Sequence, residues 1–410
     1  MKALSAEDKI GDVYNLSPVA PNERIHALDM LRGLAMFGVL WSNLNDWYGT
    51  IDPTTSLDKG LQWIHWNLIS GRFYTLLCLL FGIGFGIQLL RATEKGMDIS
   101  RVYFRRTMIL LLIGVIHGIL IWNFDILTMY ALVAFSLVLF RKSSSRNILI
   151  TAILIWIFYP YLVTRFEILV GWKFYNPSIH GPKIVWALGH SSWLQIEEIR
   201  IAQYLEWYDR FWPVLYGSIL ATFLVGWWTI KSGYLMRVIQ NPRTTRRLLL
   251  IAVLAVTIGY LTNMYLPVLM PYHNVKITGI TDPNLWNPEM IVWSIFGWST
   301  EGNAIVYATI LLLLLQRSAI ARLLQPLGAA GRMALTTYLT QSVVCTLLFY
   351  GYGLGWYGQV GYTGNLIITL VLFSCQMAVS SWWLKRFRFG PVEWLWRRLT
   401  YGHPIPMRVE

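Results

Sequence analysis

The sequence predicts an all-α protein, a polytopic transmembrane bundle of about ten helices with both termini in the cytoplasm. Three observations lead to this prediction. Of the 410 residues, 55% are hydrophobic and only 13% are charged, whereas a soluble chain carries about 25% charged residues. Apolar runs long enough to cross about 30 Å of hydrocarbon recur along the chain. Lysine and arginine gather in alternate connections between these runs, as the positive-inside rule requires.

Ten apolar runs predict the spans in order. They cover about residues 31 to 47, 70 to 90, 104 to 123, 125 to 140, 147 to 165, 211 to 230, 247 to 267, 290 to 316, 333 to 351 and 363 to 384. Only residues 123 to 125 separate the third run from the fourth, so we expect a tight hairpin there. In the second run, the three glycines of FGIGFG lie within an apolar helix and favour close helix packing over phosphate binding.

The distribution of basic residues predicts the orientation of the bundle. With the amino terminus inside, the inner connections hold 25 Lys and Arg and the outer ones hold 8. This asymmetry places both termini in the cytoplasm. The formal net charge of +13 does not indicate a nucleic-acid partner, because the basic residues are divided among connections between apolar runs. The partner that the composition does indicate is the lipid bilayer.

The chain divides into a cytoplasmic tail at 1–23, a transmembrane bundle at 24–386 and a cytoplasmic interfacial segment at 387–410. The tail is polar and lacks the apolar core of a signal peptide. The carboxyl-terminal segment mixes tryptophan with arginine, which predicts a position on the inner membrane surface. Within the bundle, the outer loop 166–210 carries an amphipathic pattern in its second half. This pattern fits either a helix lying on the membrane surface or a lid over an outward-facing pocket.

The first predicted span carries polar groups at both ends. Asp29 and Arg32 lie three residues apart and therefore on one helical face. Asn43 follows eleven residues after Arg32, which separates the two by about 16 Å along a helix. One end can therefore lie near one membrane face while the other reaches past the midplane.

His117 is the leading candidate for chemistry. It lies inside the third span, where an ionisable group normally faces a cavity or a partner, and Asp125 follows eight residues later. Along a straight helix eight residues extend about 12 Å, so the two side chains meet only if the hairpin corner folds back. A carboxylate beside an imidazole is the usual arrangement for a general base. The alternative is a histidine that a neighbouring helix satisfies.

Further polar groups are expected on the outer side. His65 and Arg72 lie near the start of the second span, on the same side as Asn43, and could share one polar chamber. For Arg72 the alternative is an arginine that only reaches the membrane interface. Glu301 lies within the predicted eighth span, where an unpaired carboxylate would be unfavourable by a few kcal/mol. We therefore expect Glu301 to be protonated, paired with arginine or exposed to the chamber.

The chain resembles the YeiB-like family of bacterial membrane proteins in four separated stretches over nearly its whole length. They are RIHALDMLRG near the amino terminus, RRTMILLLIGVIHGILIWNFDILTMYAL, AAGRMALTTYLTQS and the closing GPVEWLWRRLTYG. This resemblance implies a multi-pass protein of the bacterial inner membrane, and transport is the activity with which such proteins are usually associated.

A more distant similarity links the first span to transmembrane acyltransferases, including those that acetylate surface polysaccharides and heparan glucosaminide N-acetyltransferase. In the polysaccharide enzymes an arginine is followed eleven residues later by a histidine. Arg32 matches that arginine, and Asn43 stands in the place of the histidine. The heparan enzyme resembles this chain in having asparagine there and a later histidine, for which His65 is the nearest candidate.

Two functional hypotheses compete. In the first, an acyltransferase holds the phosphates of cytoplasmic acyl-CoA with arginines at the inner side and passes the acyl group to a small-molecule or glycan acceptor outside. The residues that we expect to bind acyl-CoA are Arg32 with Asp29, Arg105, Arg106 and Arg332, and those expected to act in catalysis are His117, Asp125, His65 and Asn43. We expect acyl-CoA as a co-substrate, no tightly bound cofactor and no metal.

In the second hypothesis, a carrier moves a small anionic solute along a proton-coupled path through His117, Asp125 and the substrate-binding residues Arg72 and Glu301. The gathering of charge at both ends of one span, without similar halves in the sequence, favours the first hypothesis. A membrane protein with a purely structural role is the third alternative. Nothing in the sequence indicates an oligomeric state.

Overall fold

The computed structural model describes residues 25–94, 100–170, 182–210, 212–269 and 299–409. Helices make up most of these ranges, and the described residues contain one isolated antiparallel bridge, between Phe387 and Arg408. The predicted all-α class is therefore confirmed. The predicted tail 1–23 lies outside the described residues, and the proposed boundaries at 24, 386 and 387 remain predictions.

The main helices are α2 (His26–Trp47), α3 (Ser56–Ile64), α4 (Arg72–Glu94), α5 (Ser100–Leu120), α6 (Leu127–Leu137), α7 (Ser145–Val170), α8 (Pro182–His190), α9 (Trp193–Arg210), α10 (Trp212–Lys231), α11 (Tyr234–Gln240), α12 (Pro242–Leu269), α14 (Ser299–Leu314), α15 (Ser318–Leu323), α16 (Gln325–Arg332), α17 (Ala334–Phe349), α18 (Tyr362–Trp383) and α19 (Pro391–Tyr401). A π-helix (His65–Ile69) joins α3 to α4, and a 3-10 turn (Val138–Phe140) extends α6.

A helix lies at each of the ten predicted apolar runs, although the first part of the eighth run, up to residue 298, is outside the described residues. By length and hydropathy, four stretches of the described chain are able to cross a membrane, namely 56–94, 100–120, 242–262 and 362–383. Shorter apolar helices lie at 127–140, 145–160, 300–314 and 334–349. The protein is therefore a helical membrane protein, and the count of ten spans and the side of each terminus remain predictions.

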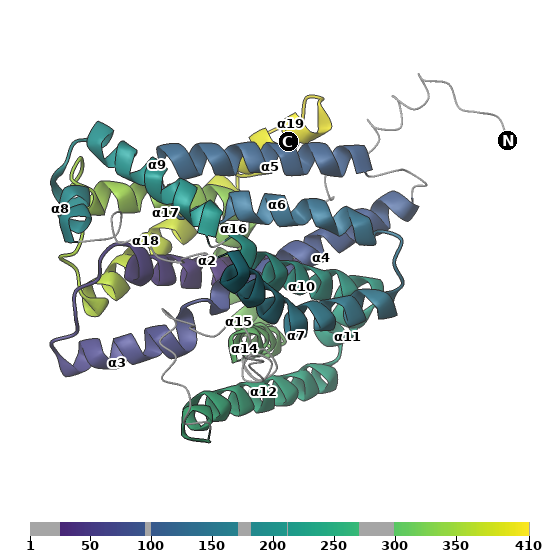
Figure 1. Cartoon of the computed structure of the whole chain (residues 1–410). Coiled ribbons are helices and arrows are strands. Elements are labelled where there is room, and N and C mark those ends of the chain that lie inside the picture. Colours follow the sequence, from purple (N-terminus) through teal and green to yellow (C-terminus); the bar gives the residue numbers. More distant parts are fainter. Residues whose placement is uncertain (1–24, 95–99, 171–181, 211, 270–298, 410) are drawn as a thin grey trace.

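Glycines allow several of these helices to approach closely. A Cβ at Gly82 of α4 would collide with the main-chain carbonyl of Phe223 in α10, and one at Gly331 of α16 would collide with the carbonyl of Asp29 in α2. Small residues at such crossings let backbones pack without an intervening side chain. The pairs α4 with α10 and α2 with α16 are accordingly among the most extensive helix contacts of the described chain. In Figure 1, α4, α5, α6 and α10 run alongside one another across the view.

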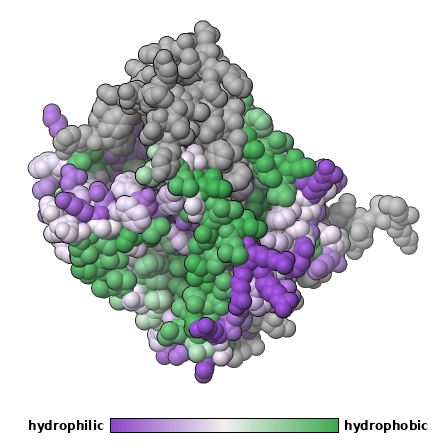
Figure 2. Space-filling model, turned by 90° about the horizontal axis from the view of Figure 1, so that it is seen from below, coloured by the Kyte–Doolittle hydropathy of each residue, from purple (hydrophilic) through white to green (hydrophobic). Residues whose placement is uncertain are grey.

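The outer surface of the bundle is apolar where a membrane protein meets lipid. On α12, which lies along the lower edge of Figure 1, the exposed residues include Leu250, Ile251, Leu254, Leu261 and Met264. Figure 2, which views this side, shows a broad hydrophobic area with hydrophilic residues at its margins. Hydrocarbon exposure explains such a surface, because a soluble monomer rarely exposes so large an apolar patch.

Candidate functional site

A cavity of about 620 Å³ lies inside the bundle, between α2, α4, α5, α6, α17 and α19. Its size is within the range of small-molecule and cofactor sites. Along α4 it extends from Leu77 to Glu94, which is about 25 Å of helix. We call the half near the start of α2 and the end of α4 the basic end, and the half near Leu77 the deep end.

Six arginines and three acidic residues line this cavity: Arg32, Arg91, Arg106, Arg332, Arg388 and Arg397, with Asp29, Glu94 and Glu393. No lysine is among the described lining residues. An excess of three positive charges in a partly enclosed site favours an anionic ligand. Guanidinium groups in particular match the geometry of phosphate and carboxylate, because each offers a planar pair of donors.

Two of the predicted acyl-CoA residues are held firmly at this end. Arg32 Nη1 lies 2.9 Å from Asp29 Oδ1, so the aspartate orients the guanidinium. The Arg106 guanidinium stacks 3.9 Å from the ring centroid of Trp396 in α19. Arg332 also lines the cavity, but Arg105 does not: it is exposed and lies near Gly402 at the end of α19. Three arginines of the predicted set are therefore together, with Asp29, and Arg105 lies elsewhere.

A buried carboxylate fixes α19 as one wall of the cavity. Glu393 accepts hydrogen bonds from the main-chain N–H groups of Leu335 (2.6 Å) and Thr336 (3.0 Å) and from the Thr336 hydroxyl (2.5 Å). These donors belong to the first turn of α17, where a carboxylate is favourable. Burial raises the pKa of Glu393 above its ordinary value, although the hydrogen bonds from Thr336 act in the opposite direction. The carboxyl-terminal segment is thus packed into the site.

One glycine of the FGIGFG run faces the cavity. A Cβ on Gly84 would meet no atom within 4 Å, whereas the one on Gly86 would touch Trp227 and Ile230. The packing role predicted for this run therefore applies to Gly82 and Gly86. Gly84 lines the cavity instead. Because glycine has no side chain, part of the cavity volume lies next to this residue.

Two tyrosines line the deep end of the cavity. Tyr130 of α6 donates a hydrogen bond to the main-chain carbonyl of Tyr74 at 2.9 Å. Tyr338 of α17 accepts one from the Ile126 N–H at 3.3 Å, and its hydroxyl lies 3.5 Å from Asp125 Oδ1. Tyr338 therefore joins the cavity to the carboxylate at the hairpin corner.

His117 and Asp125 form a buried pair at that corner. His117 Nδ1 lies 2.8 Å from Asp125 Oδ1, and the two residues are 1% and 0% exposed. The other carboxylate oxygen accepts the Thr128 N–H at 2.7 Å, which caps the start of α6. Because the carboxylate accepts at Nδ1, that nitrogen carries the proton. The opposite nitrogen, Nε2, is buried and has no hydrogen-bond partner among the described residues.

Helix α9 covers this corner, as Figure 1 shows where α9 crosses the end of α6. Tyr208 donates to the Asp125 carbonyl at 2.8 Å, and the Tyr204 and Thr128 hydroxyls lie 3.1 Å apart. The fully buried Arg200 donates to the carbonyl of Leu120 at the end of α5. The amphipathic helix predicted in the outer loop is confirmed. The face that α9 turns onto the bundle includes both Ile196 and the charged Arg200, each 0% exposed, so the arrangement matches a cover more closely than a helix lying free on the surface.

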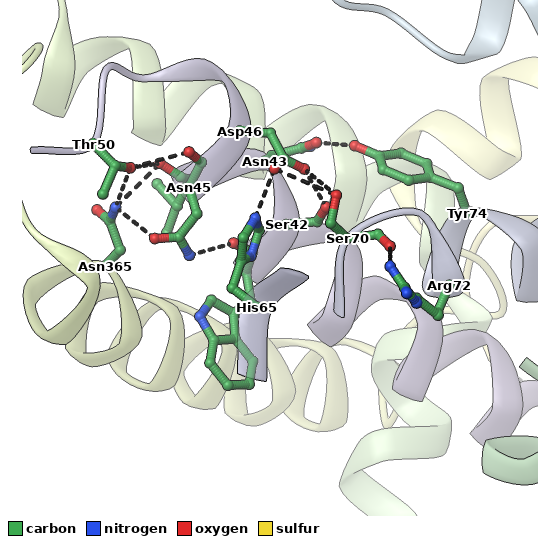
Figure 3. Close-up of polar contacts among 12 residues, drawn as sticks. Ser42, Asn43, Asn45, Asp46, Thr50, His65, Ser70, Arg72, Tyr74 and Asn365 are labelled. Carbon is green, nitrogen blue, oxygen red and sulfur yellow. Dashed lines mark hydrogen bonds and ion pairs between the residues drawn. The ribbon is translucent and has the colours of Figure 1, made fainter. Parts of the chain in front are cut away.

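A second histidine and aspartate form another pair between α2 and the π-helix (Figure 3). His65 Nε2 lies 2.7 Å from Asp46 Oδ1, and Asp46 Oδ2 accepts the Ser42 hydroxyl at 2.6 Å and the Ser70 hydroxyl at 3.2 Å. A π-helix is frequent at functional sites because its extra residue displaces side chains from the helical register. The Nδ1 atom of His65 is buried without a hydrogen-bond partner in the described chain.

Asn43 belongs to the same region and accepts a hydrogen bond from the Tyr74 hydroxyl (Figure 3). An aromatic stack joins residues next to the two histidine pairs, with the Trp47 and Phe124 ring centroids 4.1 Å apart. Trp47 follows Asp46 and Phe124 precedes Asp125. The chamber expected on sequence grounds is therefore divided, with His65 and Asn43 in one cluster and His117 in the other.

Arg72 and Glu301 lie outside the cavity lining. Arg72 donates to the Ser70 carbonyl, and the charge of its guanidinium acts on the Glu301 carboxyl. Glu301 is in the first turn of α14, where the helix dipole favours a negative group. Pairing of Glu301 with an arginine therefore stays a prediction, and no described contact joins either residue to the His117–Asp125 pair.

Sequence reasoning did not identify several lining residues. Arg388 and Arg397 are distant from Arg32 in the sequence, and Tyr338 is an ordinary residue of an apolar helix. Only the arginine and tryptophan pattern of the closing segment gave a signal, and it was assigned to the membrane surface. Asp46, the partner of His65, was not among the predicted site residues either.

Comparison with known proteins gives consistent matches along the chain. Residues 229–403 match a family described as protein of unknown function DUF418. Uncharacterized protein YxaH of Bacillus subtilis (strain 168) is 33% identical over 412 residues, covering 94% of this chain and 96% of the relative. Uncharacterized protein YeiB of Escherichia coli (strain K12) is 27% identical over 414 residues, covering 92% and 96% respectively. An uncharacterized 39.9 kDa protein of Bacillus acidopullulyticus is 27% identical over 395 residues, covering 96% and 98%.

Proposed function

The chain belongs to the YeiB-like family of membrane proteins, and from this premise and the arginine-lined cavity we propose that it is a transmembrane acyltransferase that uses acyl-CoA. The acyl-CoA enters from the cytoplasm, and the acceptor is a small molecule or glycan at the outer side of the bacterial inner membrane. One observation carries the proposal. A single cavity joins a cluster of six arginines to Tyr338, which touches the His117–Asp125 pair.

The basic end suits the phosphates of CoA. Arg32, oriented by Asp29, and Arg106, stacked on Trp396, present guanidinium groups to a ligand from α2 and α5. Each charged hydrogen bond to a phosphate contributes about 1.5 to 3 kcal/mol. The remaining arginines raise the local positive potential. A ligand anchored here directs its other end along α4 toward the apolar deep end, formed by groups such as Leu77 and Phe81.

His117 is the proposed general base. The acceptor's hydroxyl oxygen or amine nitrogen attacks the carbonyl carbon of the thioester, and its proton passes to Nε2 of His117. The carbon–sulfur bond breaks, the acyl group remains on the acceptor, and the thiolate of CoA takes the proton from Nε2. Asp125 holds the Nδ1 proton and stabilises the imidazolium between these two transfers. His65 and Asn43, in the neighbouring cluster, are proposed to hold the acceptor.

The carrier alternative has less support from the geometry. It requires a path that includes Arg72 and Glu301, and these lie apart from the cavity and from His117. Of the residues proposed for acyl transfer, Arg32, Arg106 and Arg332 line the cavity, and His117 and Asp125 adjoin it through Tyr338. The two hypotheses differ in their products, because only acyl transfer releases free CoA and leaves a covalently modified acceptor.

Two neighbouring arginines provide a matched test. Purified protein is incubated with radiolabelled acetyl-CoA and a membrane extract as the acceptor source, and acetyl-CoA binding is measured separately. We expect Arg106→Met to weaken acetyl-CoA binding about tenfold or more and to reduce transfer. Arg105→Met, which changes an exposed neighbour outside the cavity, should remain within about twofold of the wild type. Equal effects of the two substitutions, or transport of a solute without release of CoA, would contradict the proposal.

A further inference from the structure

We propose that the Tyr338 hydroxyl donates a hydrogen bond to the carbonyl oxygen of the bound acyl group and stabilises the charge that develops there. This inference rests on the proposed acyl transfer and adds a catalytic residue to it. Of the described residues, Tyr338 both lines the cavity and lies within reach of the His117–Asp125 pair. Its hydroxyl is 3.5 Å from Asp125 Oδ1, and its ring centroid is 5.2 Å from that of His117.

The hydrogen bonds around Asp125 leave the Tyr338 proton available. One carboxylate oxygen is 2.8 Å from His117 Nδ1, and the other accepts the Thr128 N–H at 2.7 Å. Both are of ordinary length for a charge-assisted hydrogen bond. The contact from Tyr338 is at the limit of a hydrogen bond. A ligand oxygen at a shorter distance therefore competes successfully for this proton.

The Tyr338 oxygen is also positioned by the main chain. It accepts the Ile126 N–H at 3.3 Å, which fixes the oxygen at the cavity wall and leaves the phenol proton to point elsewhere. A donor that is already in place costs no reorganisation when negative charge appears on the carbonyl oxygen during attack. The thioester carbonyl requires such a donor close to the base that activates the acceptor.

Tyr130 also lines the deep end of the cavity, but both hydrogen-bonding roles of its hydroxyl are already used within the protein. Its proton is donated to the Tyr74 carbonyl at 2.9 Å, and its oxygen accepts from the Cys78 thiol at 3.2 Å. Tyr130 lines the cavity as Tyr338 does, but its hydroxyl already has a donor and an acceptor. Substitution of Tyr130 by phenylalanine therefore provides a matched control.

Two ligands together measure how much the carbonyl oxygen contributes to binding, and neither measurement requires an acceptor. One is the dethia analogue of acetyl-CoA, a ketone in which a methylene group replaces the sulfur, so that no acyl group can be transferred. The other is S-ethyl-CoA, which lacks the carbonyl oxygen. Their affinities are measured by calorimetry for the wild type, Tyr338→Phe and Tyr130→Phe in the same detergent.

We expect Tyr338→Phe to weaken binding of the ketone about threefold to tenfold, as loss of one neutral hydrogen bond does, and to leave S-ethyl-CoA unchanged. Tyr130→Phe should preserve the preference for the ketone. Turnover of acetyl-CoA should fall about a hundredfold in Tyr338→Phe. Equal loss for both ligands, or no loss for either, would overturn the role of Tyr338 while leaving the proposed acyl transfer in place.

A second measurement uses the wild-type protein alone and does not depend on folding of the variant. The infrared stretch of a ¹³C-labelled ketone carbonyl should shift to lower frequency on binding, relative to an aprotic solvent, because the hydrogen bond weakens the carbon–oxygen bond. An unshifted band in the bound state would overturn the inference. Failure of the wild type to bind either ligand would overturn the proposed function itself.

Discussion

His117 Nδ1 and Asp125 Oδ1 lie 2.8 Å apart across the corner between α5 and α6. Along a straight helix the two residues would be separated by about 12 Å. Reversal of the chain after Leu120 brings them together, and α9 keeps the corner closed through the Tyr208 hydrogen bond to the Asp125 carbonyl. The position of the histidine proton therefore depends on a tertiary arrangement.

Asp125→Asn tests that dependence. The amide oxygen can still accept the Thr128 N–H, which leaves the amide nitrogen facing His117. His117 must then accept at Nδ1 and carry its proton on Nε2, so it no longer serves as the base. We expect turnover to fall about a hundredfold or more, while the unfolding temperature changes by only a few degrees. A variant with nearly wild-type turnover in the acetyl-CoA assay would refute the role of this pair.

His117→Ala provides the companion measurement. Because one imidazole contributes little to the packing of a span, we expect normal expression and complete loss of turnover. Binding of acetyl-CoA should persist, since the arginines that hold the phosphates remain. A fully active His117→Ala protein would mean that this histidine has only a structural role.

Arg200 is expected to stabilise the cover over the corner. Its fully buried guanidinium pairs with Glu197 and donates to the last carbonyls of α5. Removing one partner of a buried pair costs about 3 to 5 kcal/mol. Arg200→Met should therefore lower the unfolding temperature by several degrees, and the double variant Glu197→Gln with Arg200→Met should recover part of the loss. An unchanged unfolding temperature in Arg200→Met would show that α9 does not depend on this pair.

The helices were predictable because membrane-spanning helices appear in the sequence as apolar runs, and a helix lies at each of the ten runs in the part of it that the structure describes. The amphipathic pattern also predicted α9, since its polar and apolar residues alternate at helical spacing. The contact between His117 and Asp125 was expected only conditionally, because sequence spacing does not determine how a corner folds.

The cavity was less accessible to sequence reasoning. Arg32 and Arg106 were expected to act together, but Arg388 and Arg397 join them through the packing of α19 on α5 and α17. Such a contact between chain ends depends on tertiary geometry. Tyr338 gave no signal because a tyrosine in an apolar helix most often only packs. The division of the polar residues into two clusters also depends on tertiary geometry, so the sequence could not predict it.

The pKa of Glu393 predicts a pH dependence of stability. Burial raises this pKa in the folded protein, so the folded state binds more protons than the unfolded state between the two pKa values. Stability from this group is fully present below the unfolded pKa and is lost as pH rises through the folded pKa. Glu393→Gln removes the titration while keeping an oxygen that can accept the α17 N–H groups.

The unfolding temperature of Glu393→Gln, relative to the wild type, should therefore rise as pH increases above the unfolded carboxyl pKa of about 4. Thermal melts of both proteins in one detergent, with matched ionic strength, measure this difference. A relative unfolding temperature that falls as pH rises would show that the hydrogen bonds from Thr336 prevail and that the folded pKa is lowered.

The orientation predicted from basic residues has a direct chemical test. Ser144 and Ser192 are exposed at the two ends of the bundle, after α6 and before α9 respectively. In a background without the native cysteines, an impermeant thiol reagent should label Ser192→Cys in intact cells and Ser144→Cys only after lysis. The reverse labelling would place the arginine-lined end of the cavity outside, where acyl-CoA is absent.

Binding of acetyl-CoA inside the cavity is the central claim, and two glycines allow it to be measured directly. A Cβ at Gly84 or at Gly60 would meet no atom within 4 Å, but only Gly84 lines the cavity. Calorimetric titration with acetyl-CoA should give saturable binding to the wild type and to Gly60→Leu. In Gly84→Leu the new side chain fills ligand space, and we expect binding to weaken about tenfold or more with an unchanged unfolding temperature. Absence of binding to the wild type, or equal affinity of all three proteins, would contradict the account.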